Sequence, residues 1–258
     1  MLCLGKTNIG MKRSVNQDNF RISEFGENSV LAVVCDGMGG AAGGATASDL
    51  AATTFTECIS ARISDFTKKR FLTMTDERRV KNLLREAVRR ANDAVFEAAQ
   101  NDESLRGMGT TLVATLLLAG DLYTVNVGDS RMYLISGDKI EQVTHDHSYV
   151  QYLVDMGQIT PEEARTSTRK NIITRAVGTT EEVEADVFVS RAEAGRSVAI
   201  LCSDGLANYV SEDELLYDVT KSCVDFSCEG LSAWLDDLIE RANDAGGSDN
   251  ITAVILSV

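Results

Sequence analysis

The amino-acid sequence predicts an α+β fold in which helices cover the faces of antiparallel β-sheets. Short apolar runs rich in β-branched residues recur along the chain, and segments with apolar residues at helical spacing alternate with them in blocks. Pro161 is the single proline, and no Gly/Ser/Pro-rich linker or repeat divides the chain. We therefore expect residues 1–258 to form one domain.

The predicted strands are the apolar runs at residues 30–35, 111–119, 122–127, 132–135, 198–202 and 251–258. Turn-forming residues around Gly120 and Gly137 separate neighbouring runs. Spacings this short do not accommodate crossover helices. The segment 111–144 is therefore predicted to be an antiparallel meander.

The longest predicted helix spans residues 76–100, where apolar side chains recur at helical spacing and Arg and Glu occupy the other face. Residues 45–63 and 231–245 show similar patterns. Thr160, Pro161 and Glu163 have the spacing of a capping box that opens a short helix with proline at its first position.

The chain has 39 acidic and 25 basic residues, which gives a formal net charge of −14. This surplus argues against binding to nucleic acid or anionic lipid through a broad basic surface. The longest apolar run, 112–119, is far shorter than the roughly 20 residues that a membrane helix needs. We expect no membrane span and, without a recognisable signal peptide, a cytoplasmic protein. The six cysteines form no Cys-x-x-Cys pair, and those within apolar runs, Cys35 and Cys202, are expected to pack as small hydrophobes.

Acidic residues recur where predicted strands begin or end. Asp36 and Asp204 follow buried runs, Asp249 precedes the last one, and Asp18 follows Asn16-Gln17 near the N-terminus. A single Asp in such a position is usually a turn former. Several at one sheet edge would repel one another unless protons or cations neutralise them. The pattern thus predicts a cation site.

All the candidate ligands are hard oxygen donors, which favours magnesium or manganese over zinc. Carboxylates that hold two such ions are suited to in-line displacement at phosphorus. Arg13, close in sequence to Asp18, is a candidate partner for the phosphoryl oxygens.

The glycine-rich segment 37–43 offers a competing interpretation. It follows a predicted strand, opens a predicted helix and precedes Glu57 by about 20 residues, as in a dinucleotide-binding turn. Asp36 would place a negative charge beside the pyrophosphate, and the meander after residue 111 does not fit a parallel sheet. We therefore disfavour nucleotide binding. A P-loop, an Asp-x-Asp pair and a Cys-x-x-x-x-x-Arg loop are all missing from the sequence.

The chain resembles the metal-dependent Ser/Thr protein phosphatases of the 2C type, in their compact bacterial form, over nearly its whole length. The motifs that carry the resemblance occur in the family's order: Arg13 with Asn16-Gln17-Asp18, Asp36-Gly37-Met38-Gly39-Gly40, Gly109-Thr110-Thr111, Val127-Gly128-Asp129-Ser130-Arg131, Thr144 with Asp146-His147-Ser148, Ile173-Thr174-Arg175-Ala176 with Gly178, Ser203-Asp204-Gly205 and Ser248-Asp249-Asn250-Ile251-Thr252.

This resemblance implies a four-layer α-β-β-α sandwich with metal ions, Mn²⁺ or Mg²⁺, in a channel at one end. Asp36 would bridge two ions, and the first would also be held by the Gly37 carbonyl, Asp204 and Asp249. Asp18 would lie near the second ion, and Asp129 with Asp204 matches the positions of a weaker third. Arg13 would grip the phosphate while a metal-bridged hydroxide attacks phosphorus directly.

Two departures from the family pattern affect the chemistry. Met38 stands where many eukaryotic relatives have a histidine credited with protonating the leaving oxygen, so the general acid is unassigned. His147 is expected to be a structural hydrogen-bonding residue. Segment 149–170 corresponds to the family's flap beside the site, but Ser167-Thr168 replaces the His-Pro often found there, which leaves substrate specificity open.

The sequence thus predicts a monomeric enzyme, a metal-dependent protein-serine/threonine phosphatase. Its partners would be phosphorylated proteins, including a bacterial Ser/Thr kinase that it opposes. The alternative from another class is a pseudophosphatase that binds phosphoproteins without turnover, which the intact acids disfavour. A hydrolase of small phosphate esters is a lesser alternative.

Overall fold

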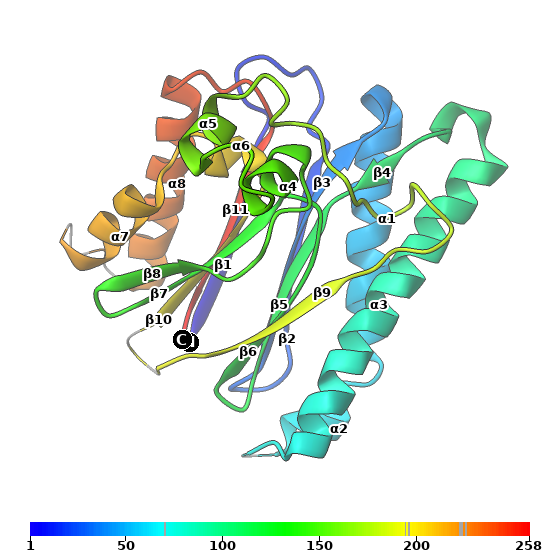
Figure 1. Cartoon of the computed structure of the whole chain (residues 1–258). Helices are drawn as coiled ribbons and strands as arrows, with labels where there is room; N and C mark the ends of the chain where they lie inside the picture. Colours follow the sequence, from blue (N-terminus) through cyan, green and yellow to red (C-terminus); the bar gives the residue numbers. More distant parts are fainter. Residues whose placement is uncertain (70, 194, 196, 222–223, 225) are drawn as a thin grey trace.

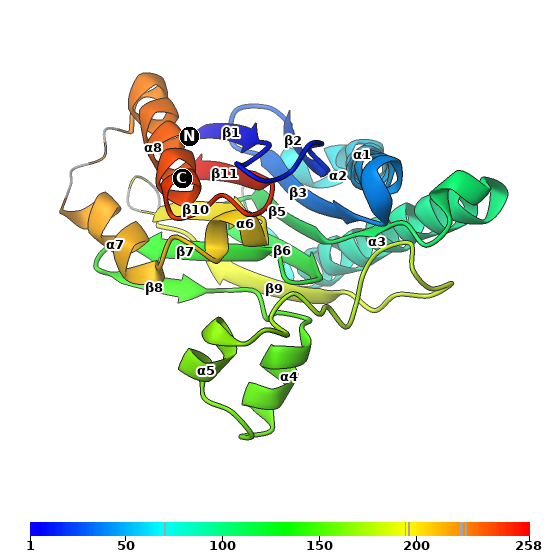
Figure 2. The same ribbon diagram turned by 90° about the horizontal axis from the view of Figure 1, so that it is seen from above.

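A computed structural model describes the chain except for residues 70, 194, 196, 222, 223 and 225. Two antiparallel sheets are stacked face to face, and helices cover both outer faces (Figures 1 and 2). Among the described residues, one sheet has the order β1-β11-β10-β7-β8: Leu2–Asn8, Ile251–Ser257, Ser197–Cys202, Arg131–Ser136 and Lys139–Gln142. The other has the order β2-β3-β5-β6-β9: Asp18–Glu24, Val30–Met38, Leu112–Leu118, Asp121–Val127 and Asp186–Arg191, with β4 (Gly109–Thr110) beside β3.

Long helices cover the β2-β3 sheet. α1 (Gly40–Ser60) and α3 (Met74–Asn101) pack on it, and the short α2 (Ser64–Thr67) joins them. Thr73 caps α3 through a capping box with Asp76, which satisfies backbone N–H groups that the first helical turn leaves free. The other sheet is covered by α6 (Asp204–Ala207), α7 (Glu212–Thr220) and α8 (Cys228–Asp244).

The hydrophobic core has three layers, one under each group of helices and one between the sheets. Strand β3 illustrates how the sequence produces them, because successive side chains of a strand point to opposite faces. Leu31 and Val33 pack toward α1 and α3, whereas Ala32 and Val34 pack against the other sheet. The expected α-β-β-α sandwich is confirmed, and so are the six predicted strands.

The predicted meander over 111–144 is wrong at one point. Strands β5 and β6 form a hairpin in one sheet, and β7 and β8 form a hairpin in the other. The chain changes sheets at residues 128–130, where Gly128 has φ 109°, a conformation that favours glycine. The apolar runs on either side look alike because both sheets are buried, so periodicity gave no sign of the change. Asp129 stands at this crossing.

The segment 149–170 forms two short helices, α4 (Tyr149–Asp155) and α5 (Pro161–Thr166), that project from the sandwich (Figure 2). The capping box predicted at Thr160 and Glu163 is present, with Pro161 in the first helical turn. None of the described helices is long and apolar enough to cross a membrane.

The described cysteines are free thiols. Cys35 and Cys202 are buried as predicted, and burial raises the pKa of both thiols. Cys228 is exposed at the start of α8 and so does not contribute to the core. Cys223 lies outside the described residues.

Candidate metal centre

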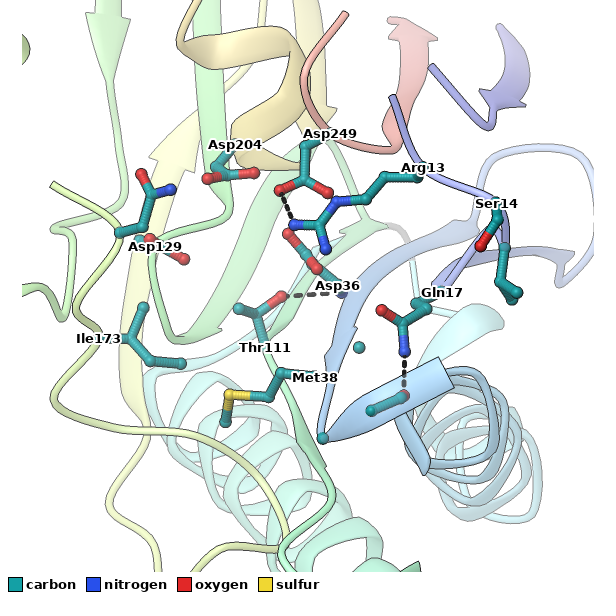
Figure 3. Close-up of a pocket in the computed structure, with 15 residues that line it drawn as sticks. Arg13, Ser14, Gln17, Asp36, Met38, Thr111, Asp129, Ile173, Asp204 and Asp249 are labelled. Atoms are coloured by element: carbon teal, nitrogen blue, oxygen red, sulfur yellow. Dashed lines mark hydrogen bonds and ion pairs between the residues drawn. The ribbon is translucent and has the colours of Figure 1, made fainter. Parts of the chain in front are cut away.

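A pocket of about 400 Å³ opens where strands of both sheets end (Figure 3). It is lined by the candidate residues Arg13, Asp36, Gly37, Asp129, Asp204 and Asp249, together with Gln17, Met38, Thr111 and others. Segments far apart in the sequence thus meet in one place. Of the residues predicted from sequence to form the site, only Asp18 is not on the pocket surface.

Asp18 and Asp36 are register partners on the adjacent strands β2 and β3. Asp18 is buried at 8% exposure, and its Oδ2 accepts a 2.8 Å hydrogen bond from the hydroxyl of Ser203. Its Oδ1 is buried with no hydrogen-bond partner. Asp18 therefore lies behind the pocket surface beside Asp36, and its Oδ1 is free to bind a cation or to accept a hydrogen bond from a water.

The other three acids come from connections between elements. Asp129 follows β6 at the crossing between sheets, Asp204 is the first residue of α6 and is separated from β10 by Ser203, and Asp249 immediately precedes Asn250 and β11. Figure 3 shows Asp204 and Asp249 turned toward Asp36. The sandwich therefore brings Asp204 and Asp249, which adjoin strands of one sheet, close to Asp36 on a strand of the other sheet.

Thr111 supports the backbone at Asp36, a role that sequence reasoning missed. Its hydroxyl accepts a 2.9 Å hydrogen bond from the Asp36 amide and lies 2.7 Å from the Ser130 hydroxyl. Ser130 adjoins Asp129, so one buried contact joins the segments that carry two of the acids. Thr111 belongs to the motif Gly109-Thr110-Thr111, but nothing in the sequence indicates which backbone group its hydroxyl contacts.

Arg13 reaches the pocket from the loop between β1 and β2. Its Nη2 donates to Asp249 Oδ2 at 2.7 Å, and its guanidinium lies beside Asp36 in Figure 3. The hydrogen bond to Asp249, followed by the attraction of nearby carboxylates, raises the pKa of Arg13. Arg13 is thus the permanent cation within an otherwise acidic pocket.

The carboxyl groups disfavour one another's ionisation. Burial, together with the charges of Asp204 and Asp249, raises the pKa of Asp18 to about 7. Burial and the charge of Asp204 raise that of Asp129 to about 8. The pKa of Asp36 and that of Asp204 are also raised, again by burial first and by neighbouring carboxylates second. Such a cluster strongly favours cations, whose binding removes both penalties.

The donor set fits divalent cations that prefer oxygen. The donors are carboxylates and a backbone carbonyl, and Asp18 Oδ1 and Asp204 Oδ1 are buried without a partner. Within the described part of the chain, however, no three His, Cys, Asp or Glu side chains are already arranged to hold an ion. Two of the other oxygens accept hydrogen bonds from protein donors, Asp249 Oδ2 from Arg13 and Asp204 Oδ2 from Asn208. We therefore expect Asp204 and Asp249 to exchange these hydrogen bonds for contacts to an ion when one binds.

The remaining candidates for proton transfer are poorly placed. Met38 lines the pocket and has no proton to donate. His147 Nδ1 accepts a 3.1 Å hydrogen bond from the Gly128 amide, and its Nε2 lies 3.2 Å from Asp186. Burial lowers the pKa of His147, so the neutral ring with a proton on Nε2 is favoured. The expectation that His147 is structural agrees with these contacts.

Without divalent cations, the free energy of unfolding should fall as the pH rises from about 5 to about 8. The folded pKa values of Asp18 (about 7) and Asp129 (about 8) exceed the ordinary 3.8, so the folded state binds more protons across this range. Each group contributes at most about 1.4 kcal/mol per pH unit. Urea denaturation of chelator-treated protein measures the slope, and Asp129→Asn should flatten it. A stability that rises with pH, or an unchanged slope in the variant, would contradict the raised pKa values.

A two-sheet sandwich with acids and an arginine converging at its strand ends is the arrangement of the metal-dependent phosphatases. The family model for protein phosphatase 2C matches residues 5–252. The chain is 37% identical over 251 residues to the serine/threonine phosphatase stp of Listeria welshimeri, which covers 97% of this chain and 93% of that protein. The chain belongs to the protein phosphatase 2C family.

Solved structures agree with this assignment. Serine/threonine phosphatase Stp1 from Staphylococcus aureus aligns with a TM-score of 0.83 at 33% identity, covering 99% of this chain and 94% of that one. The catalytic domain of serine threonine protein phosphatase PstP, in complex with 2 manganese ions, aligns with a TM-score of 0.78 at 33% identity, covering 98% and 96%. The resemblance seen in the sequence motifs and the predicted fold are both confirmed.

Proposed function

We propose that this protein hydrolyses phosphoserine and phosphothreonine in proteins, with divalent cations held by the acids of the pocket. The observation that carries the proposal is the convergence of Asp36, Asp129, Asp204 and Asp249 with Arg13 in one cavity. Burial and mutual repulsion raise the pKa values of Asp36, Asp129 and Asp204, so the cluster favours bound cations, and an anionic phosphate ester can bind there only when cations are present. Stp and PstP, named as Ser/Thr phosphatases, support the choice of substrate.

The proposed ligand assignment follows the position of each group. Asp36, central in the cluster, would contact two ions, and the Gly37 carbonyl, Asp204 and Asp249 would complete the first. Asp18 would support the second through its free Oδ1, and Asp129 with Asp204 would hold a third. Manganese or magnesium suits these donors; bound there, it would lower the pKa of a water and neutralise charge that develops on the phosphoryl group.

The side chains of the protein would orient the phosphate, and they limit which groups can supply the proton and the nucleophile. Arg13 has five N–H donors, and one of them bonds to Asp249; when Asp249 binds an ion instead, all five are available to phosphoryl oxygens. Because Met38 carries no proton, another group in the pocket would protonate the leaving oxygen, and a water bound there is our candidate. No cysteine or serine nucleophile is needed.

The substrates would be phosphoproteins, including a Ser/Thr kinase that the enzyme opposes, and the enzyme would act as a cytoplasmic monomer of one domain. The segment 149–170 projects from the sandwich (Figure 2) and would contact the protein around the phosphorylated residue. Arg165 and Lys170 in this segment line a second cavity that shares Asp129 and Asp204 with the first. Their positive charge suits acidic sequences next to the phosphoresidue.

Hydrolysis of a phosphothreonine peptide and of a phenyl phosphate, with manganese and with chelator, tests the proposed function. We expect hydrolysis of both substrates only with manganese. Activity that persists after complete chelation would contradict the metal-dependent chemistry. Tight phosphopeptide binding without turnover would instead identify the chain as a pseudophosphatase.

Removing the arginine should weaken phosphate recognition more than it weakens the chemical step. We expect Arg13→Ala to raise KM for the phosphopeptide by about 10-fold to 100-fold, because charge-assisted hydrogen bonds to phosphate are lost. Arg13→Lys should recover part of the loss, since lysine keeps the charge but not the planar donor pair. Steady-state kinetics measure both parameters. An unchanged KM in Arg13→Ala would remove Arg13 from the phosphate site.

A further inference from the structure

The loop that carries Arg13, residues 9–17, is anchored to the turn that carries Asp249. The Met11 amide donates to the Gly247 carbonyl at 2.8 Å. Gly10 lies so close to the turn that a Cβ atom there would be 2.1 Å from the Asp249 carbonyl oxygen. The position of the loop is therefore set by backbone contacts with the segment 247–250.

Asn250 makes the most extensive of these contacts. Its side-chain oxygen accepts a 2.8 Å hydrogen bond from the Gln17 amide. Its Nδ2 donates to the carbonyls of Ile9 at 2.9 Å and Val15 at 3.1 Å. Asn250 is only 3% exposed, so water cannot replace these partners. The three bonds hold the loop on both sides of Arg13.

We propose that Asn250 is a positioning residue that places the Arg13 guanidinium for phosphate binding, an inference that rests on the proposed function. The Arg13 side chain is 48% exposed, and its one hydrogen bond within the pocket goes to Asp249. Its own packing therefore does not fix where it points. Asn250 fixes the backbone from which Arg13 extends. The hydrogen bonds of its side chain go to backbone groups of the loop and not to the Arg13 side chain.

A buried side-chain amide with all these hydrogen bonds could also serve only to stabilise the fold. The chain contains a second such asparagine, which serves as a matched control for Asn250. Asn92 on α3 is 1% exposed, accepts from the Gly178 amide at 2.7 Å, and donates to the carbonyls of Thr180 and Glu181 at 3.0 and 3.1 Å. It thus makes the same three kinds of hydrogen bond to a different loop. Asn92→Ala controls for the loss of stability that Asn250→Ala will also cause.

The experiment compares manganese-loaded full-length wild type, Asn250→Ala, Asn92→Ala, Arg13→Ala and the double variant Arg13→Ala/Asn250→Ala. For each, it measures KM and kcat for a phosphothreonine peptide and Kd for inorganic phosphate by calorimetry. We expect Asn250→Ala to raise KM and the phosphate Kd about 10-fold, because small displacements of a binding group are costly. Asn92→Ala should leave both within about twofold of wild type. In the Arg13→Ala background the Asn250 substitution should have no further effect.

A phosphate Kd that stays at the wild-type value in Asn250→Ala, or an increase that adds fully to that of Arg13→Ala, would overturn the proposal. Hydrogen exchange of residues 9–17 gives a readout independent of activity. Exchange of these residues should accelerate in Asn250→Ala and not in Asn92→Ala. Unchanged exchange in Asn250→Ala would also overturn the proposal. If wild type hydrolyses no phosphopeptide, the proposed function fails while phosphate binding and exchange still decide the role of Asn250. Should Asn250→Ala not fold, Asn250→Ser replaces it.

Discussion

Asp36→Asn is expected to lower kcat for phosphopeptide hydrolysis by about 10³-fold or more, equivalent to about 4 kcal/mol of transition-state stabilisation. Asp36 lies at the centre of the acidic cluster, and its pKa is raised first by burial and then by each of the other four acids. An amide keeps the shape of the side chain but neither the charge nor the capacity to bridge two cations. Steady-state assays over a range of manganese concentrations measure the loss.

The same substitution should make the metal-free protein more stable, because an amide carries no charge for its neighbours to repel and folding no longer has to protonate a carboxyl group to avoid that repulsion. Activity and stability thus move in opposite directions, which separates this effect from simple unfolding. Asp138→Asn, in the exposed turn between β7 and β8, is the control and should change neither quantity. Wild-type kcat in Asp36→Asn at saturating manganese would contradict the central role of Asp36.

Gly37→Ala is expected to destabilise the protein by about 3 kcal/mol or more and to reduce activity with it. A Cβ at residue 37 would lie 2.0 Å from the Gly44 carbonyl oxygen and 2.7 Å from that of Gln17. Both are backbone atoms, so no side-chain rotation relieves the overlap. Strand β3 would be pushed away from α1 at the point where Asp36 enters the pocket. Urea denaturation of the manganese-loaded protein measures the free energy of unfolding.

Gly43→Ala is the control for the glycine-rich segment. A Cβ there would meet the side chain of Met108 at 3.1 Å, a contact that a small adjustment can relieve. Alanine also favours the helical conformation of α1 by up to about 1 kcal/mol. We expect a much smaller loss than in Gly37→Ala. Equal losses in the two variants would show that the close approach of Gly37 to α1 is not what requires glycine.

The strands that sequence patterns identified share one physical property, near-complete burial on both faces. Strands β3, β5 and β10 are continuous apolar runs because each packs between a helix layer and the other sheet. Strands β1, β2 and β9 were not predicted, because they are mainly half-buried and mix polar with apolar residues. The change of sheet after β6 was missed since it depends on pairing, which local periodicity does not encode.

Asp18, Asp36, Asp204 and Asp249 were predictable from the sequence pattern, because acids beside buried strands need neutralisation, whereas Asp129 was identified only through the family resemblance. Their arrangement was not predictable. The hydrogen bond from Arg13 to Asp249 and the buried position of Asp18 below the pocket surface depend on the packing of loops from both sheets. The role of Asn250 was also not predictable. Its side chain bonds only to backbone groups, which every residue has, so no partner residue in the sequence indicates the contact.

Diffraction from crystals grown with manganese, measured on both sides of the manganese absorption edge, tests the central claim most directly. The account predicts anomalous peaks in the pocket, with one within about 2–2.6 Å of an Asp36 carboxylate oxygen and others near Asp204 and Asp249. It also predicts that Arg13 leaves Asp249 when that carboxylate binds an ion. Peaks found only outside this pocket, in a protein whose phosphatase activity requires manganese, would contradict it.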